Sequence, residues 1–128
     1  KAHGYHWNVE SDDFAQLHEF FGEIYSDYDA ATDTYAEWLR MLKSYSPYRL
    51  TDFFDLSAVG ENVLVGDPEP MIADLYFEIE RHILFLVDAG KLATSLNEFG
   101  LANFLADRQT ASQKFCWMLR ASMEVEAD

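Results

Sequence analysis

The chain has 128 residues, of which 49% are hydrophobic and 16% aromatic, and this composition is sufficient for one sizeable core in a single domain spanning residues 1–128. Nine basic against 23 acidic residues give a formal net charge of -14, which disfavours direct binding to nucleic acid or to an anionic membrane and favours cations as small partners. No apolar run reaches the roughly 18 to 20 residues that a membrane span needs.

The chain opens on Lys1-Ala2-His3-Gly4, without a methionine and without the character of a signal peptide. We therefore expect that a segment preceding Lys1 was removed or not supplied, so that the first helix is truncated. A single cysteine, Cys116, lies in an amphipathic stretch and has no second cysteine to pair with. This fits a reducing compartment and predicts a cytoplasmic location.

A helix is predicted to begin after Ser11-Asp12-Asp13, because these side chains can accept hydrogen bonds from the free amides of a first turn and the acids favour its positive end. From Phe14 to Leu42 apolar residues recur at spacings of three and four, and no proline interrupts them before Pro47. The pattern predicts one helix of about 30 residues, roughly 45 Å long, separated from a preceding helix by a break over residues 8–13.

Residues 45–66 differ in character, since Pro47, Gly60 and Gly66 interrupt them and only residues 50–56 resemble a short helix. A crossover of this length allows the long helices on either side to run parallel. Asp67-Pro68-Glu69-Pro70 then predicts the start of a second long helix, since proline is tolerated in the first turn.

The buried side of this second helix carries apolar residues and one histidine at helical spacing: Met71, Leu75, Ile79, His82, Ile83, Leu86 and Leu92. A short turn over residues 97–100 precedes a last helix, which keeps the same period from Leu101 to Met123. The predicted fold class is therefore all-α, an up-and-down helical bundle with one long crossover.

Four side chains in the first third of the chain can bind a metal ion: His6, His18, Asp33 and Glu37. Imidazole nitrogen and carboxylate oxygen suit iron, zinc or manganese, and the absence of thiolates argues against a purely structural zinc site. Asp33 and Glu37 are four positions apart and face the same side of a helix, so both carboxylates can reach one cation. His18 lies four turns away on that helix and could join them only through a second chain.

The order and spacing of these residues resemble the Dps family, the DNA-binding proteins from starved cells, also called miniferritins. The following segments carry the resemblance: His6-Trp7-Asn8-Val9, Phe14, Leu17-His18-Glu19, Tyr25, Asp33, Ala36-Glu37 and Trp117-Met118-Leu119-Arg120-Ala121. The resemblance extends over nearly the whole chain. It implies a ferritin-like four-helix bundle in which residues 50–59 contain the short helix of the crossover.

The resemblance also implies a function. In this family non-haem iron is held between two subunits, with His6 and His18 on one side and Asp33 and Glu37 on the other, and two-fold dimers build a hollow homo-oligomeric shell. Such proteins act as ferroxidases, in that they oxidise Fe(II) with peroxide or oxygen, store the iron and protect against oxidative stress. Trp7, beside the first histidine, would be an accessory residue that absorbs stray oxidising equivalents.

The chain departs from the family at Gly22, where an acidic ligand is expected one turn after His18. Glu23 is rotated by about 100° and Glu19 by about 60° from that direction, so water or Glu19 would have to fill the position. Ferroxidase activity is therefore an open question, and the alternative is a non-catalytic ferritin-like structural or assembly protein, for instance a virion component.

DNA binding is not supported, because the family uses basic terminal extensions and residues 123–128 are acidic. The remaining histidines, His3 and His82, are expected to lie outside the site.

Overall fold

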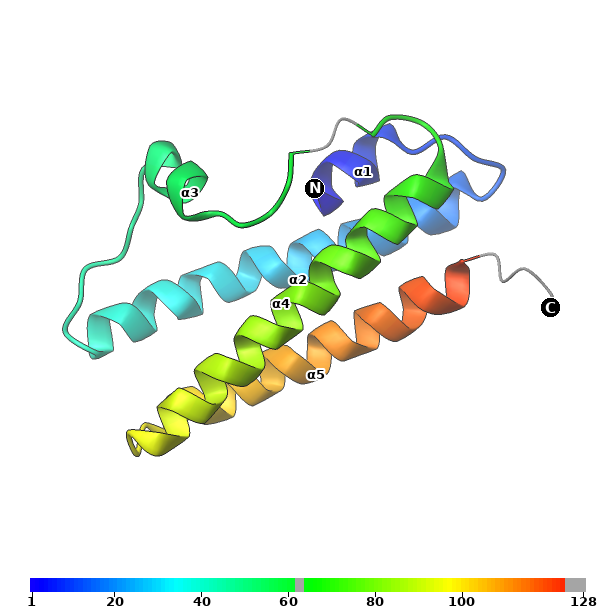
Figure 1. The fold of residues 1–128 in the computed structure, drawn as a ribbon. Helices are drawn as coiled ribbons and strands as arrows, with labels where there is room; N and C mark the ends of the chain where they lie inside the picture. Colours follow the sequence, from blue (N-terminus) through cyan, green and yellow to red (C-terminus); the bar gives the residue numbers. More distant parts are fainter. Residues whose placement is uncertain (62–63, 124–128) are drawn as a thin grey trace.

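The computed structural model describes residues 1–61 and 64–123. Its elements are five helices: α1 (Ala2–Asn8), α2 (Phe14–Met41), α3 (Leu50–Leu56), α4 (Pro68–Ser95) and α5 (Phe99–Ser122) (Figure 1). The described ranges contain no strand, only an isolated bridge between Val9 and Gly66. The all-α class is therefore confirmed, and each predicted helix is present with its ends shifted by only a few residues.

Three long helices form the body of the described bundle. Helices α2 and α4 run in the same direction and α5 returns antiparallel to them, as the colours of Figure 1 show. The connection from α2 carries α3 at one end of the bundle and then runs back to the end where α1 lies (Figure 1). The parallel course of α2 and α4, predicted from the length of the crossover, is confirmed.

A side-chain hydrogen bond caps the start of α4 but not the start of α2. Asp67 accepts a hydrogen bond from the Glu69 amide at 3.2 Å, and Pro68 occupies the first turn of α4, as predicted. At the start of α2 it is the Ser11 hydroxyl that accepts a hydrogen bond, from the Asp13 amide at 3.1 Å. This hydrogen bond belongs to the turn before the helix, and the Asp13 side chain at the N-cap makes no capping hydrogen bond, so the side-chain cap predicted for α2 is absent.

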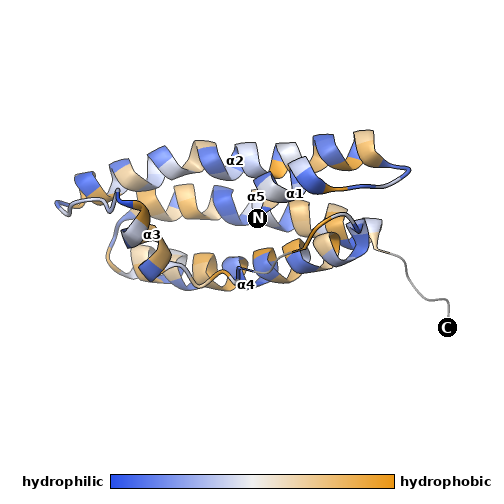
Figure 2. Cartoon of the chain, turned by 90° about the horizontal axis from the view of Figure 1, so that it is seen from above, coloured by the Kyte–Doolittle hydropathy of each residue, from blue (hydrophilic) through white to orange (hydrophobic). Residues whose placement is uncertain are grey.

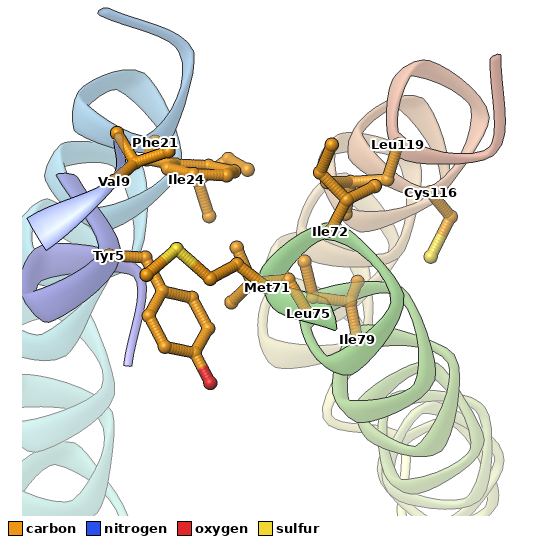
Figure 3. Close-up of a cluster of buried hydrophobic side chains, with 10 residues drawn as sticks. All are labelled: Tyr5, Val9, Phe21, Ile24, Met71, Ile72, Leu75, Ile79, Cys116 and Leu119. Carbon is orange, nitrogen blue, oxygen red and sulfur yellow. The ribbon is translucent and has the colours of Figure 1, made fainter. Parts of the chain in front are cut away.

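The main core lies where α1, α2, α4 and α5 meet (Figure 3). In Figure 2 hydrophobic and hydrophilic residues alternate along each long helix, which lets one side of each helix face this core. Phe21, Met71 and Leu119 are completely buried, and burying a side chain of this size stabilises the fold by about 1.5–3 kcal/mol. The full set of buried core residues is Tyr5, Val9, Phe21, Ile24, Met71, Ile72, Leu75, Ile79, Cys116 and Leu119.

The end of the crossover is fastened to the turn between α1 and α2. The Glu10 amide donates to the Gly66 carbonyl at 2.8 Å, and the Gly66 amide donates to the Asn8 carbonyl at 3.1 Å. Gly66 has a φ of 86°, in the left-handed region that favours glycine, so this residue suits the sharp bend before α4. The two hydrogen bonds fix the place at which α4 enters the bundle.

Among the described helices none combines the length and the apolar character that crossing a membrane requires.

Candidate metal site

His6 and His18 face each other across the contact between α1 and α2. Their rings stack with centroids 3.8 Å apart and an interplanar angle of 14°. Each ring also bonds to the backbone of the other residue: His6 Nδ1 lies 2.5 Å from the His18 carbonyl oxygen, and His18 Nδ1 lies 2.7 Å from the His6 carbonyl oxygen. The structure thus brings together two of the four predicted ligands.

This reciprocal arrangement fixes which nitrogen of each ring is available. A carbonyl oxygen only accepts hydrogen bonds, so Nδ1 of each ring must carry a proton, and in the neutral ring the lone pair then lies on Nε2. Within the described ranges no hydrogen-bond partner of either Nε2 is present. Metal-binding histidines use the same arrangement, in which the second ring nitrogen donates to a carbonyl and so orients the ligand.

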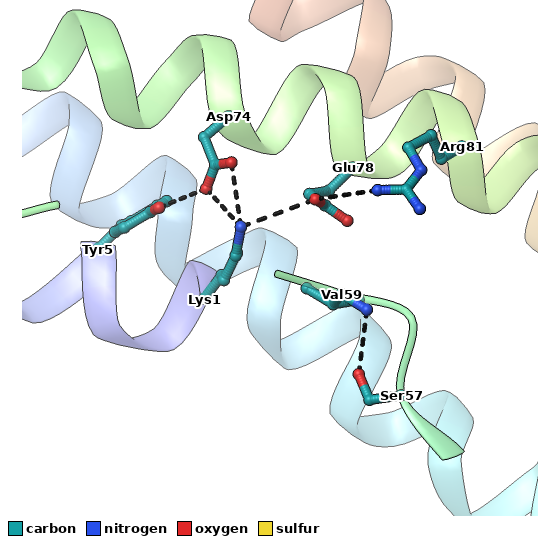
Figure 4. Close-up of polar contacts among 7 residues, drawn as sticks. All are labelled: Lys1, Tyr5, Ser57, Val59, Asp74, Glu78 and Arg81. Atoms are coloured by element: carbon teal, nitrogen blue, oxygen red, sulfur yellow. Dashed lines mark hydrogen bonds and ion pairs between the residues drawn. The ribbon is translucent and has the colours of Figure 1, made fainter. Parts of the chain in front are cut away.

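The position of His6 depends on polar contacts that attach α1 to α4 (Figure 4). Lys1 Nζ lies 2.8 Å from an Asp74 carboxylate oxygen and 3.8 Å from Glu78, and the Tyr5 hydroxyl donates to Asp74. Burial of the phenol, together with its hydrogen bond to Asp74, raises the pKa of Tyr5. The seven residues of α1 are too few to form a stable helix alone, so these contacts and the core residues Tyr5 and Val9 hold it in place.

Asp33 and Glu37 lie together on the exposed surface of α2, as their spacing predicted. A hydrogen bond with Asp33 and the repulsion of its charge raise the pKa of Glu37. Such a pair of carboxylates is favourable for a cation, because a positive charge between them removes their repulsion.

The carboxylate pair and the histidine pair are well separated within one chain. Asp33 follows His18 by fifteen residues on the same uninterrupted helix, a distance of about 22 Å along its axis. Over residues 1–61 and 64–123 there is accordingly no group of three or more His, Cys, Asp or Glu side chains that could hold a metal ion. The four predicted ligands therefore lie as two separate pairs in one chain, and each pair could form at most a half-site of the predicted metal site.

The two acidic residues closest in sequence to Gly22 lie along a different surface. Glu19 and Glu23 line an open groove of about 480 Å³ between α2 and α5, together with Phe20 and Trp117. The accessory role of Glu19 at the histidine pair stays a prediction that this placement does not favour.

His3 lies nearer to the histidine pair than its position in the sequence led us to expect. Its ring stacks on Tyr25, with centroids 3.9 Å apart and an interplanar angle of 8°, and its centroid is 6.3 Å from that of His6. The exposed Trp7 also packs against this stack, with its ring 3.8 Å from the His3 ring. His3 and His6 are three residues apart, which places them on the same side of α1, and this spacing could have predicted their proximity from the sequence.

His82 is half-buried and lines the same cavity, of about 440 Å³, as His3 and Tyr25. Its ring meets the edge of Tyr28 at a centroid distance of 5.7 Å, and its buried Nε2 has no hydrogen-bond partner among the described residues. Burial and the positive charge of Arg108 lower the pKa of His82.

Comparison with known proteins gives a consistent result. The family model for the ferritin-like domain matches residues 1–126. The sequence is 25% identical over 121 residues to DNA protection during starvation protein 2 of Bacillus anthracis, an alignment that covers 94% of this chain and 83% of that protein.

The fold is shared with solved structures of similar length. The structure of a Dps protein from Bacillus brevis matches with a TM-score of 0.92 at 25% identity, covering 97% of this chain and 83% of that one. The Dps protein of Vibrio cholerae O1, described as a member of a broad superfamily of ferritin-like diiron-carboxylate proteins, matches with a TM-score of 0.89 at 25% identity, covering 94% and 76%.

Proposed function

The chain belongs to the ferritin-like family and its resemblance to the Dps proteins is confirmed, and on this basis we propose that it is a miniferritin that binds and oxidises Fe(II) and stores the iron. The iron would be held between two copies of the chain. His6 and His18 of one copy would bind it through Nε2, and Asp33 and Glu37 of the other copy would supply carboxylate oxygens.

The reciprocal hydrogen bonding of His6 and His18 is the observation that carries this proposal. Two imidazoles whose Nδ1 atoms are occupied by carbonyls keep their Nε2 atoms available for a metal ion. A merely structural pair could equally well have bonded through Nε2 or to solvent. The donor set of imidazole and carboxylate suits Fe(II), which is the substrate and cargo of the proposed reaction.

The separation of the half-sites supports the need for a second copy. A two-fold axis that sets two α2 helices antiparallel would bring the histidine half of each chain to the carboxylate half of the other, and would create the site twice. Helix α3 exposes Leu50, Phe54 and Leu56 by 85%, 69% and 71%, and large apolar side chains of this kind are what an interface covers. We infer that these copies assemble further into a hollow shell.

Within the site each half would have a distinct task. The carboxylates of Asp33 and Glu37 would attract Fe(II) and offset the positive charge that increases when it loses an electron to peroxide or molecular oxygen. The imidazoles would keep the ion in place while leaving positions open for the oxidant. The net charge of -14 would favour the entry of further cations and would disfavour a direct approach to DNA.

The decisive experiment is an anaerobic Fe(II) titration followed by addition of peroxide, with the particle mass determined in the same buffer. The wild type should bind Fe(II) stoichiometrically and oxidise it rapidly on a shell-sized particle, and His18→Ala should lose both properties. His82→Gln serves as the matched control, because it removes an imidazole outside the proposed site. Absence of oxidation in the wild type would instead support the alternative of a ferritin-like structural or assembly protein.

A further inference from the structure

Gly22 lies directly against the ring of His6. A β-carbon placed on Gly22 would be 3.0 Å from His6 Nδ1 and 3.1 Å from His6 Cε1, closer than most β-carbons approach any neighbour. Gly22 is in the interior of α2, where glycine is less favourable for the helix than alanine. A glycine in this place therefore has a cost in helix stability, and the contact with His6 supplies a reason for it.

The His6 ring has little freedom to retreat from a larger residue. Its Nδ1 is held by the His18 carbonyl of the same helix at 2.5 Å, so movement away from α2 lengthens this hydrogen bond. The His18 ring occupies its other side at a centroid distance of 3.8 Å. The backbone of α1 is attached to α4 through Lys1 and Tyr5 and cannot shift freely.

We propose that Gly22 is a positioning residue, whose missing side chain makes room for the imidazole of His6 to pair with His18. The histidine pair would then be formed before any metal binds. Its relevance to iron rests on the proposed function, but the packing relation between Gly22 and His6 does not.

In the family pattern, an acidic residue at this position supplies a metal ligand. In this chain we expect the opposite effect, because an acidic side chain at position 22 would disturb the histidine pair. Gly22→Asp would introduce a carboxylate near the site, yet its β-carbon would push the His6 ring by a few tenths of an ångström and strain the hydrogen bond that orients it. Gly22 is thus part of a different version of the half-site, composed of two imidazoles without an adjacent carboxylate. Such a half-site suits divalent cations that accept nitrogen ligands, among them Fe(II), Co(II) and Zn(II).

The first test measures thermal unfolding in metal-free buffer for Gly22→Ala in two backgrounds. With His6 present, the substitution should lower the Tm, because the ring is displaced. In the His6→Ala background it should raise the Tm, because only the gain in helix propensity remains. Gly90→Ala is the matched control, since Gly90 is also inside a long helix and a β-carbon placed on it would have no neighbour within 4 Å. It should raise the Tm in both backgrounds.

A change of the same sign for Gly22→Ala in both backgrounds would overturn the proposal. All of these alanine variants either retain or improve helix propensity, so each is expected to fold, and circular dichroism checks that the helical content is kept.

The second test measures Co(II) binding through its visible absorption in the wild type, Gly22→Asp and Gly90→Ala. Gly22→Asp should weaken binding by about 10- to 100-fold, as loss of a ligand-orienting contact typically does. Equal or tighter binding by Gly22→Asp would contradict the inference. If the wild type itself binds no Co(II), the proposed function fails, and the Tm measurements alone decide whether Gly22 positions His6.

Discussion

At the scale of single residues, Glu37 shows how a carboxylate placed for metal binding can lower the stability of the metal-free protein. Asp33 repels the Glu37 carboxylate on the surface of α2, so the pair is unfavourable until a cation binds. We predict that Co(II) raises the Tm of the wild type, and that Glu37→Gln raises the Tm slightly in metal-free buffer but abolishes the rise caused by Co(II). Glu23→Gln, on the same helix, is the control and should leave the metal-induced rise unchanged. A metal-induced rise that survives in Glu37→Gln would remove Glu37 from the site.

The lowered pKa of His82 predicts how the stability of the folded protein depends on pH. Its pKa is lowered by burial and by Arg108, so below the ordinary value of about 6.5 the unfolded chain binds a proton more readily than the folded chain does. Stability should therefore fall as the pH decreases from about 6.5 towards the lowered pKa, where the ring becomes charged at the edge of Tyr28 and under the repulsion of Arg108. The Tm of His82→Gln should decrease less between pH 7 and pH 5.5 than that of the wild type. An equal decrease in both would show that other groups determine the acid sensitivity.

At the scale of elements, α1 is a helix of seven residues whose stability depends on its contacts with α4. Asp74 accepts hydrogen bonds from both Lys1 and Tyr5, so we predict that Asp74→Ala loosens α1 while α4 and α5 remain folded. Hydrogen exchange should accelerate over residues 2–8 in this variant and stay slow in α5. Asp88→Ala removes a carboxylate from the same helix and should leave exchange in α1 unchanged. Acceleration throughout the bundle in Asp74→Ala would show instead that α1 and the bundle unfold together.

The elements themselves could be predicted from the sequence, because the information that specifies them is local. Apolar residues at spacings of three and four predicted α2, α4 and α5, and Asp67 with Pro68 marked the start of α4.

The candidate site could be predicted only in part. Its four residues came from spacing and family resemblance, and their division between two chains stays a prediction. The contact of His6 with Gly22 depends on how α1 packs on α2, which no pattern within one helix specifies.

At the scale of the whole molecule, the exposed apolar surface of α3 leads to a prediction about assembly. Phe54 is 69% exposed in the single chain, and a charge introduced there would have to be buried in any interface that covers it. We expect Phe54→Glu to reduce the particle mass measured by light scattering. Thr51→Glu adds the same charge at an exposed polar position of α3 and should reduce it less. An unchanged mass for Phe54→Glu would place the interface elsewhere.

The hydrogen bonds between Gly66 and residues 8 and 10 have a consequence for the continuity of the chain. They attach the crossover at its end, so we expect α4 to keep its packing against α1 and α2 when the covalent connection through residues 57–61 is cut. One piece carrying Phe21 and Ile24 and another carrying Met71 and Leu75 would each present a complementary half of the same core. A chain split within the exposed segment 57–61 should therefore reassemble from its two pieces, and the crossover would be a natural point at which to divide this protein into a reporter pair.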